Sequence, residues 1–304
     1  MGYAVFKKIK LSTIILNWNG KDRTLKCLNS LMSIKKDSFE NYIMVVDNNS
    51  FDGSVKVFKK FYPSINLIRN EKNLGWAGGN NVGVRYALKS GADCIFILNN
   101  DAVVKKDSIE KLLDVLYSKK EIGIVGPKMY YSPNKKIIAD AGGIIKQHRF
   151  FGINRGNGET DEGQYDVIEK VGFVSGAAML VKNQVFKKIG LFDESYFLYY
   201  EDVDFCFRGR KAGYLSVFVP NSIVYHKFGA TSKIGSPLHN YYTTRNHYIF
   251  VEKYAPLKEK MRELFRTPKT ITEFFLSKDE VRKKYSILGV RDYFLRRFGE
   301  KRYW

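Results

Sequence analysis

The stretch that decides the fold is Cys94-Ile95-Phe96-Ile97-Leu98-Asn99-Asn100-Asp101. Its uninterrupted apolar run is typical of a strand buried on both faces inside a parallel sheet. The chain becomes polar where this strand ends, and ligands of open α/β sheets bind outside the carboxyl ends of the strands. Asp101 is therefore a candidate anchor for a metal ion or a charged ligand. The alternative is that Asp101 only caps the helix that follows.

Two earlier segments have the same character. Leu11–Asn17 and Tyr42–Asp47 are predicted as buried strands that end in polar residues, and each is followed by a segment with helical periodicity. Strands and helices alternate in this way from residue 11 to residue 101, which predicts an α/β protein with a parallel, doubly wound sheet. Asn17, Asp47 and Asp101 would then share one edge of the sheet. Each of these residues could by itself be a helix cap, but the three together favour a ligand-binding site.

A glycine-rich segment, residues 73–83, precedes the deciding strand and opens a helix. Its spacing does not match G-x-G-x-x-G and no strand adjoins its first glycine, so a dinucleotide-binding fingerprint is a poor match. The glycines still permit close approach of the backbone to a ligand, and the N-terminus of the helix can bind a phosphate.

A cluster of carboxylates among aromatic residues lies in the second half of the chain, at Tyr200-Glu201-Asp202-Val203-Asp204. On a helix that begins near Glu201, Glu201 and Asp204 share one face and Asp202 points elsewhere. Carboxylates in a first turn stabilise a helix through its dipole, which is the structural explanation. The functional explanation is a general base whose pKa is raised by neighbouring apolar rings.

Two further residues are candidates for a site. His226 ends an apolar strand, as Asp101 does, so metal ligation and a structural role are equally supported. Arg245 lies in the segment 241–248, which opens a helix that continues to about Tyr254, and it could clamp a phosphate or be a surface charge. Beyond it the sequence predicts short amphipathic helices over residues 257–265, 271–276 and 281–298.

The composition narrows the classes of function. Lys and Arg number 51 against 31 Asp and Glu, a formal charge of +20, and residues 251–304 hold 15 basic against 8 acidic side chains. A basic surface can attract nucleic acid or the anionic cytoplasmic face of a membrane, or simply keep the protein soluble. Three cysteines without paired spacing argue against a disulfide framework or a zinc site and suit a reducing cytoplasm. No apolar run is long enough to cross a bilayer, and the N-terminus does not resemble a signal peptide.

Taken in order, these motifs resemble the family 2 glycosyltransferases of the GT-A fold, and most of all their rhamnosyltransferase-like branch. The motifs are ILNWNG at 15–20, VVDNNSxDG at 45–53, NxGxxGxN at 73–80, LNND at 98–101, YEDxDxxxR at 200–208, His226 and Arg245-Asn246. The resemblance covers roughly residues 11–250. It implies a GT-A, Rossmann-like domain over residues 1–250, with a mostly parallel central sheet flanked by helices. Residues 251–304 would form a basic helical extension packed on that domain.

The resemblance also implies an activity. This is an inverting transfer of a sugar from a nucleotide-diphosphate sugar to a hydroxyl of a glycan or lipid-linked acceptor, in the synthesis of a cell-surface polysaccharide, with rhamnose from a thymidine donor as the first choice. Asp202 matches the general base, with Glu201 beside it. Asp47 matches the aspartate that reads the nucleotide base. The remaining positions implied for the donor nucleotide are Asn17, Asn49, Gly78, Asn80, Asn100 and Arg245, and those implied for the acceptor side are Tyr200, Asp204 and Arg208.

A divalent metal, Mg²⁺ or Mn²⁺, is implied at Asn99-Asn100-Asp101, which matches the metal-binding D-x-D position of the family. This chain departs from the motif, because only Asp101 keeps a carboxylate. One carboxylate, together with diphosphate oxygens, water and His226, can still hold either ion.

Two other functions were weighed against the glycosyltransferase. A non-catalytic nucleic-acid-binding protein would explain the charge, but its motifs are absent. A sugar-phosphate nucleotidyltransferase shares the sheet type but carries a glycine-rich Arg/Lys signature after its first strand, where this chain has Asn17-Trp18-Asn19-Gly20. The expected partners are therefore a nucleotide-sugar donor, a glycan or lipid-linked acceptor and an anionic membrane surface, with the protein in the cytoplasm or peripheral on the inner face of the membrane.

Overall fold

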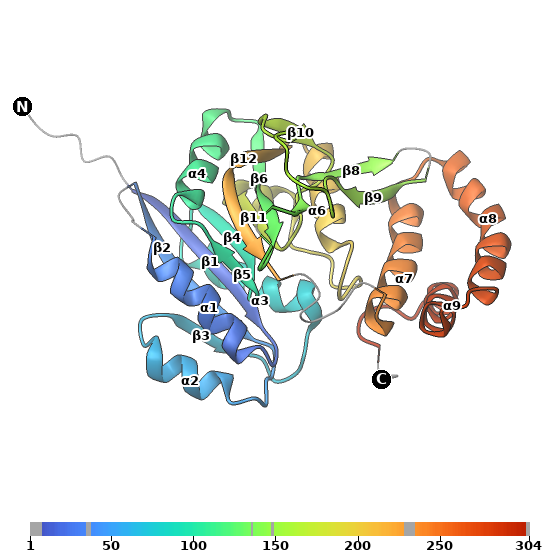
Figure 1. Ribbon diagram of the computed structural model, residues 1–304, viewed down its shortest axis with the longest axis horizontal. Helices are drawn as coiled ribbons and strands as arrows, with labels where there is room; N and C mark the ends of the chain where they lie inside the picture. The colour runs from blue at the N-terminus through green and yellow to red at the C-terminus, as the bar shows by residue number, and fades with distance from the viewer. Residues whose placement is uncertain (1–7, 35–37, 135, 147–148, 228–234, 302–304) are drawn as a thin grey trace, which may run out of the picture.

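The computed structural model describes residues 8–34, 38–134, 136–146, 149–227 and 235–301. Its centre is a large mixed sheet with helices on both faces, and a group of three helices lies at one end of the molecule (Figure 1). The strands of the sheet are β1 (Ile9–Asn17), β2 (Phe39–Asp47), β3 (Asn66–Arg69), β4 (Cys94–Asn99), β5 (Ala102–Val104), β6 (Ile122–Tyr131), β7 (Ile138–Asp140), β10 (Glu169–Val171), β11 (Ala178–Lys182) and β12 (Leu215–His226). A separate hairpin is formed by β8 (Gly143–Lys146) and β9 (Phe151–Asn154). The helices are α1 (Lys21–Met32), α2 (Ser54–Phe61), α3 (Gly75–Lys89), α4 (Ser108–Ser118), α5 (Asn183–Ile189), α6 (Glu201–Lys211), α7 (Pro237–Tyr254), α8 (Leu257–Phe275) and α9 (Glu280–Phe294).

The N-terminal half of the sheet is parallel, as the alternation of strands and helices predicts. The strand order is β10-β12-β6-β11-β4-β1-β2-β3, and β4, β1, β2 and β3 all run in the same direction. The register pairs Asn17 with Asp47 and Leu16 with Asn99. The polar ends of these strands therefore lie side by side at one edge of the sheet, and this prediction is confirmed.

The other half of the sheet is mixed in direction. β11 lies between β4 and β6 and is antiparallel to both, while β12 is parallel to β6. The apolar stretch 171–181 contributes the end of β10 and most of β11, which lie in different parts of the sheet. Apolar content marks such segments as strands, but it does not determine their direction.

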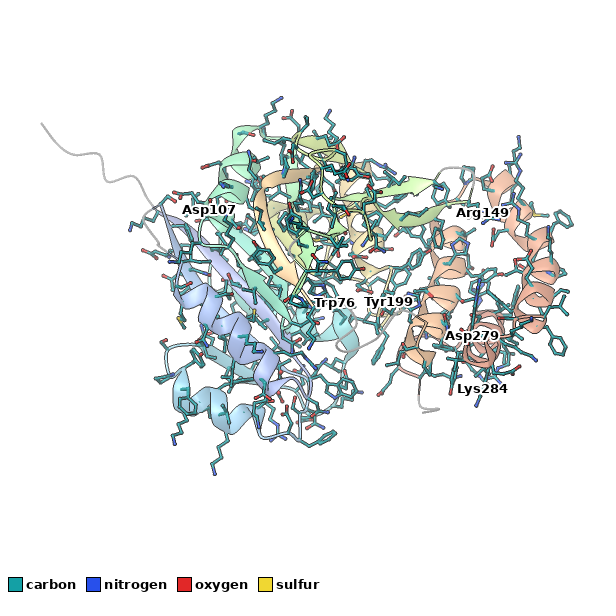
Figure 2. The ribbon with its side chains drawn as sticks, viewed as in Figure 1. Trp76, Asp107, Arg149, Tyr199, Asp279 and Lys284 are labelled. Atoms are coloured by element: carbon teal, nitrogen blue, oxygen red, sulfur yellow. The ribbon has the colours of Figure 1, made fainter. Side chains whose placement is uncertain are left out.

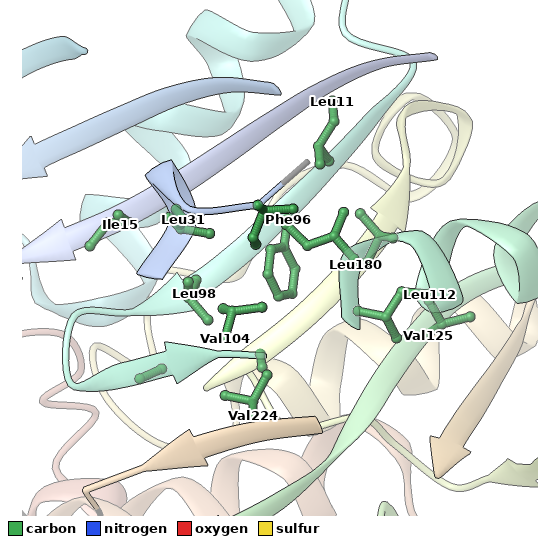
Figure 3. Close-up of a cluster of buried hydrophobic side chains, with 14 of the residues drawn as sticks. Leu11, Ile15, Leu31, Phe96, Leu98, Val104, Leu112, Val125, Leu180 and Val224 are labelled. Atoms are coloured by element: carbon green, nitrogen blue, oxygen red, sulfur yellow. The ribbon is translucent and has the colours of Figure 1, made fainter. Parts of the chain in front are cut away.

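The alternating side chains of β4 explain why its sequence is apolar throughout. Phe96 and Leu98 point into the hydrophobic cluster under α1 and α4, where Leu31 and Leu112 meet them (Figure 3). Their neighbours Ile95 and Ile97 belong to the cluster on the opposite face, with α3, α5 and α6. All four β4 side chains are at most 1% exposed, so the strand is buried on both faces.

The C-terminal helices form a layer of their own. α9 crosses α7 at close range, because a Cβ on Gly289 would lie only 2.7 Å from the backbone oxygen of Tyr241. The Tyr241 hydroxyl donates to the buried carboxylate of Asp292 over 2.9 Å. The expected boundary at residue 250 falls inside α7, and the two short helices expected between residues 257 and 276 are one helix, α8, with Pro268 inside it. In the described ranges, no helix is long and apolar enough to cross a membrane.

Candidate active site

A cavity of about 1070 Å³ opens at the carboxyl edge of the parallel strands. It is lined from one side by residues that follow β1 and β4, among them Trp18 and Asp101, and from the other by the first turn of α6, including Asp202. Its walls continue along α7 and α8. Figure 2 shows Trp76 and Tyr199, both lining residues, in the middle of the molecule between the sheet and the C-terminal helices. Segments a hundred residues apart in sequence thus meet around one space.

Asp202 sits in the first turn of α6 and is partly exposed toward the cavity. Its Oδ2 accepts a hydrogen bond from the backbone N–H of Gly176 over 2.8 Å, and its Oδ1 accepts from the N–H of Val203 over 2.8 Å. Burial raises the pKa of the Asp202 carboxyl, although these backbone donors act in the opposite direction. A fixed carboxylate of raised pKa, open to a cavity, can act as a general base.

Glu201 lies beside Asp202 but is 4% exposed. Among the described residues, nothing forms a hydrogen bond with its Oε2 atom. Burial, and then the negative charge of Asp202, raise the pKa of the Glu201 carboxyl well above its usual range. The surroundings therefore favour the neutral acid at position 201 and leave Asp202 as the carboxylate of the pair.

Asp101 and His226 are brought together by the pairing of β5 with the end of β12, which places His226 opposite Ala102. The Asp101 Oδ1 and His226 Nε2 atoms are 2.7 Å apart, and both side chains are nearly buried. Asn99 completes the group, with its Nδ2 atom 3.3 Å from His226 Nε2. Two strand ends thus supply one carboxylate and one imidazole to the same point of the cavity wall.

This group was tested as a metal site through its donor atoms. No set of three or more His, Cys, Asp or Glu side chains is placed to bind a metal ion anywhere in the described ranges. Mg²⁺ and Mn²⁺ do not need such a set, because Mg²⁺ is commonly held by one or two carboxylates together with substrate phosphates and water. Asp101 with His226 fits that pattern, provided that a phosphorylated substrate completes the coordination.

The cavity wall formed by the loops after β1, β2 and β4 is supported by a buried polar network. Asn17 is fully buried and donates to Asp47 Oδ1 over 2.8 Å, while the Ser50 N–H donates to Asp47 Oδ2 over 2.9 Å. The Thr24 hydroxyl donates to Asn17, and the Asn100 amide donates to Thr24 over 3.0 Å. Asn100 lines the cavity, whereas Asn17 and Asp47 lie in the layer behind the lining residues of the described chain. The network fixes the loops after β1, β2 and β4 relative to one another.

Three more of the predicted donor residues lie outside the lining of the cavity. Asn49 is exposed and adopts a φ of 62°. Gly78 and Asn80 are buried in α3, where Asn80 donates to the backbone oxygen of Trp76 over 3.0 Å. The cavity is instead reached from this segment by Asn73, Gly75 and Trp76, at the start of the same helix.

Arg245 is fully buried, and its guanidinium group donates to backbone oxygens of Ser195, Tyr196 and Gly299. It lies next to the cavity wall without lining it, and its visible role is to tie chain segments together. Asp204 is also fully buried and pairs with Arg208 over 2.7 Å. Of the three predicted acceptor-side residues, Tyr200 lines the cavity, whereas Asp204 and Arg208 form an internal ion pair.

The loop that carries Tyr200 has an unusual backbone. Phe197, Tyr199 and Tyr200 have φ angles of 64°, 68° and 74°, in the left-handed region that non-glycine residues rarely occupy. The Asn246 amide on α7 donates to the backbone oxygens of Tyr196, Leu198 and Tyr199 over 2.9, 2.8 and 2.8 Å. The Arg245-Asn246 pair therefore holds the loop that leads into α6.

Sequence reasoning missed several residues of the site. Trp76 donates from its indole N–H to Asn99 Oδ1, and an aromatic residue inside a glycine-rich segment was the available signal. His247 on α7 lines the cavity and lies 3.2 Å from Glu263 on α8, but nothing in the helical pattern marked them. Asp140 does not line the cavity, but it is a buried carboxyl whose pKa burial raises to about 7, and the negative charge of Asp202 acts in the same direction. Its neighbour in space could not be known before the fold.

The parallel strand ends open onto the cavity and helices cover both faces of the sheet, which is the architecture of the GT-A glycosyltransferase fold. Two solved structures have this fold. GalNAc-T7 with UDP, GalNAc and Mn²⁺ aligns with a TM-score of 0.67 at 14% identity, covering 94% of this chain and 57% of that one. A mannosyltransferase from Pyrobaculum calidifontis with GDP-Man and Mn²⁺ aligns with a TM-score of 0.59 at 13% identity, covering 95% and 88%.

The model of the family "Glycosyl transferase family 2" matches residues 12–190, and the protein belongs to that family. A dTDP-rhamnosyl transferase, RfbF, from Shigella flexneri is 29% identical over 83% of this chain and 83% of its own. An N-acetylglucosaminyl-diphospho-decaprenol L-rhamnosyltransferase from Mycobacterium tuberculosis is 28% identical over 63% of this chain and 68% of its own. The resemblance to the rhamnosyltransferase-like branch is confirmed, and the two competing functions are set aside.

Proposed function

We propose that the protein catalyses an inverting, metal-dependent transfer of a sugar, with rhamnose as the first choice, from a nucleotide-diphosphate sugar to a hydroxyl group. The acceptor is a glycan or a lipid-linked sugar used in polysaccharide synthesis. The observation that carries the proposal is that Asp101 with His226, and Asp202, line one cavity from separate walls. The names of the Shigella and Mycobacterium relatives support rhamnose as the sugar.

The donor would bind with its nucleotide against the loops after β1 and β2 and with its diphosphate near Asp101. Trp18 and Asn48 line that part of the cavity, and the buried Asn17–Asp47 network holds their loops in place. A divalent cation held by Asp101 and His226 would offset the negative charge on the departing diphosphate. The raised pKa of Glu201 keeps a second negative charge away from that leaving group.

Asp202 would act on the acceptor. The acceptor oxygen forms a bond to the sugar C1 while the bond from C1 to the diphosphate breaks, and Asp202 takes the hydroxyl proton. Attack on the face opposite the leaving group inverts the configuration at C1. The Gly176 and Val203 N–H groups fix the Asp202 carboxylate, so its direction relative to the cavity is set before substrates bind.

The size and position of the cavity suit two substrates at once. A volume of about 1070 Å³ slightly exceeds the usual range for one drug-sized ligand. The part lined by His247 and Glu263 extends away from the strand ends and would take the acceptor. We place the reaction in the cytoplasm, and the three free, buried cysteine thiols support this location.

The test is a donor panel assayed with Mn²⁺, with Mg²⁺ and with a chelator, using release of nucleoside diphosphate as the readout. We expect turnover with a thymidine-diphosphate deoxysugar that depends on the metal. Asp202→Asn should lower kcat by about 10²–10⁴-fold, because it removes the proton acceptor. Donor binding, measured as a thermal shift, should persist in this variant.

Lys211→Gln is the matched control, because it removes a charge from an exposed residue of the same helix that does not line the cavity. Turnover by Asp202→Asn at the wild-type rate would remove Asp202 from the role of base. Retention of configuration at C1 in the product would overturn the inverting mechanism.

A further inference from the structure

α8 carries a continuous apolar face that is exposed to solvent. Leu257, Leu264, Phe265, Phe275 and Leu276 are 74%, 50%, 76%, 64% and 75% exposed. With about 3.6 residues per turn, these positions fall on one side of the helix, together with Met261, Pro268 and Ile271. Surface aromatic and leucine side chains scattered singly need no explanation, but a stripe along a whole helix does.

The flank of this apolar face is basic. Lys258, Arg262 and Lys269 are exposed and lie beside Phe265 and Leu276 in the helical projection. α9, which packs on α8, adds Lys283, whose ammonium lies 4.9 Å from the centroid of the Phe275 ring. A helix with large apolar residues on one face and Lys and Arg along its border has the composition of helices that lie in the interface of an anionic bilayer.

The opposite side of α8 belongs to the cavity. Glu263, Arg266, Thr270 and Phe274 line it, whereas the apolar stripe faces away from the molecule. α8 forms the outer edge of the group of C-terminal helices and lies far from the β3 edge of the sheet (Figure 1). Nothing in the described part of the chain covers the stripe, so its burial needs an external surface.

We propose that the apolar face of α8 docks the protein onto an anionic phospholipid membrane, with Leu264, Phe265, Phe275 and Leu276 entering the interface and Lys258, Arg262 and Lys269 contacting lipid headgroups. Charge complementarity selects this occupant, since the chain carries a net charge of +20 and the stripe is bordered by cations. Docking of this kind leaves α8 between the bilayer and the part of the cavity lined by Glu263 and Arg266. It rests on α8 alone and is independent of the proposed reaction.

The test is co-sedimentation of the full-length protein with vesicles of phosphatidylcholine alone and with added phosphatidylglycerol. We expect binding to the anionic vesicles, weakening as salt is raised. The double variant Leu264→Gln/Phe265→Gln should weaken binding by about tenfold or more, because it removes two side chains from the interface. Lys258→Gln/Lys269→Gln should weaken it by roughly tenfold and flatten the salt dependence.

Phe61→Gln is the matched control, since Phe61 is 63% exposed on α2 and should leave vesicle binding unchanged. All variants change exposed residues, and thermal unfolding checks that each is folded. Equal binding of the wild type and the α8 double variant would overturn the proposal, as would failure of the wild type to bind anionic vesicles. A dimer in sedimentation velocity that the same double variant dissociates would assign the face to a second copy of the chain instead.

Discussion

The indole Nε1 of Trp76 donates a hydrogen bond to Asn99 Oδ1 over 2.9 Å, which joins the glycine-rich segment to the end of β4. The same ring packs against Gly176, where an added Cβ would lie 2.6 Å from Trp76 Cζ2. Gly176 in turn donates its N–H to Asp202. One aromatic side chain therefore connects the group around Asp101 with the proposed base on the other wall.

Trp76→Phe keeps an aromatic ring but removes the donor to Asn99. We expect kcat/KM for sugar transfer to fall by up to about tenfold, because the loss of a hydrogen bond between partly buried groups costs about 0.5–1.5 kcal/mol. Steady-state kinetics of the purified variant measure the effect, with the melting temperature as a control for folding. Unchanged kinetics would show that the Asn99 amide keeps its orientation without the indole.

The metal dependence of turnover should change when the residues at the ends of β4 and β12 are substituted. His226→Ala is expected to raise the Mn²⁺ concentration for half-maximal turnover by about tenfold or more, since a nitrogen ligand is lost. Asn99→Asp should lower that concentration, because a second carboxylate joins the Asp101 group. Metal titrations of turnover after dialysis against a chelator provide the measurement. Identical titrations for wild type and both variants would argue against a metal at this position.

The pH dependence of turnover should report Asp202. A general base works when deprotonated, so the rate falls as pH drops through its pKa, which burial raises above the usual value for aspartate. We expect the acid limb of the kcat/KM profile to lie above the pH at which an exposed aspartate titrates. Asp202→Asn should lose this limb along with most of its activity, whereas a limb that survives would belong to another group.

Asp140 should make stability depend on pH. Its folded pKa is raised to about 7 from a reference value of 3.8, mainly by burial, so its protonated form is the one that the native state accepts. The stability it contributes is present below the unfolded pKa and is lost as pH rises through about 7. Asp140→Asn, which keeps an acceptor for the Gly142 N–H, should remove this loss. Urea unfolding at several pH values measures it, and parallel curves for both proteins would contradict the prediction.

Asn246→Ala should destabilise the protein through the loop before α6. The amide donates to three backbone oxygens of a segment with left-handed residues, and we expect a loss of about 2–4 kcal/mol of unfolding free energy with reduced turnover. Asn240→Ala on the same helix is the matched control, because Asn240 donates to the Gly235 oxygen at the helix start. Its cost should be about 1 kcal/mol. Equal losses of unfolding free energy in the two variants would show that the loop does not depend on Asn246 in particular.

The polar edge of the parallel strands could be predicted because each strand end is marked by neighbouring residues in the sequence. An apolar run followed by a polar residue marks the carboxyl end of a buried strand, and parallel pairing then places Asn17 beside Asp47. The same reasoning fails for β11, since its apolar residues are compatible with either strand direction. The sequence alone also does not decide whether the polar residue at each strand end caps the following helix or binds a ligand.

The second wall of the cavity could not be predicted in this way. Asp202 is recognisable by its motif, but its proximity to Gly176 depends on how α6 packs against the β10–β11 connection. Arg245 resembled a phosphate clamp, yet its partners are carbonyl groups of its own chain, which no charge pattern reveals. The part of the cavity lined by α7 and α8 depends on how these two helices pack, and helical periodicity leaves that packing undetermined.

Gly75 joins the two walls through a backbone contact. Its φ is 72°, a Cβ there would lie 2.4 Å from the Phe197 carbonyl oxygen, and that oxygen accepts the N–H of Trp76 over 2.7 Å. In a hybrid enzyme whose C-terminal half comes from a relative, residues 75 and 197 would come from different parents, and their close contact would be disturbed. Changes in acceptor preference by recombination should succeed only where residues 75 and 197 are exchanged as a pair.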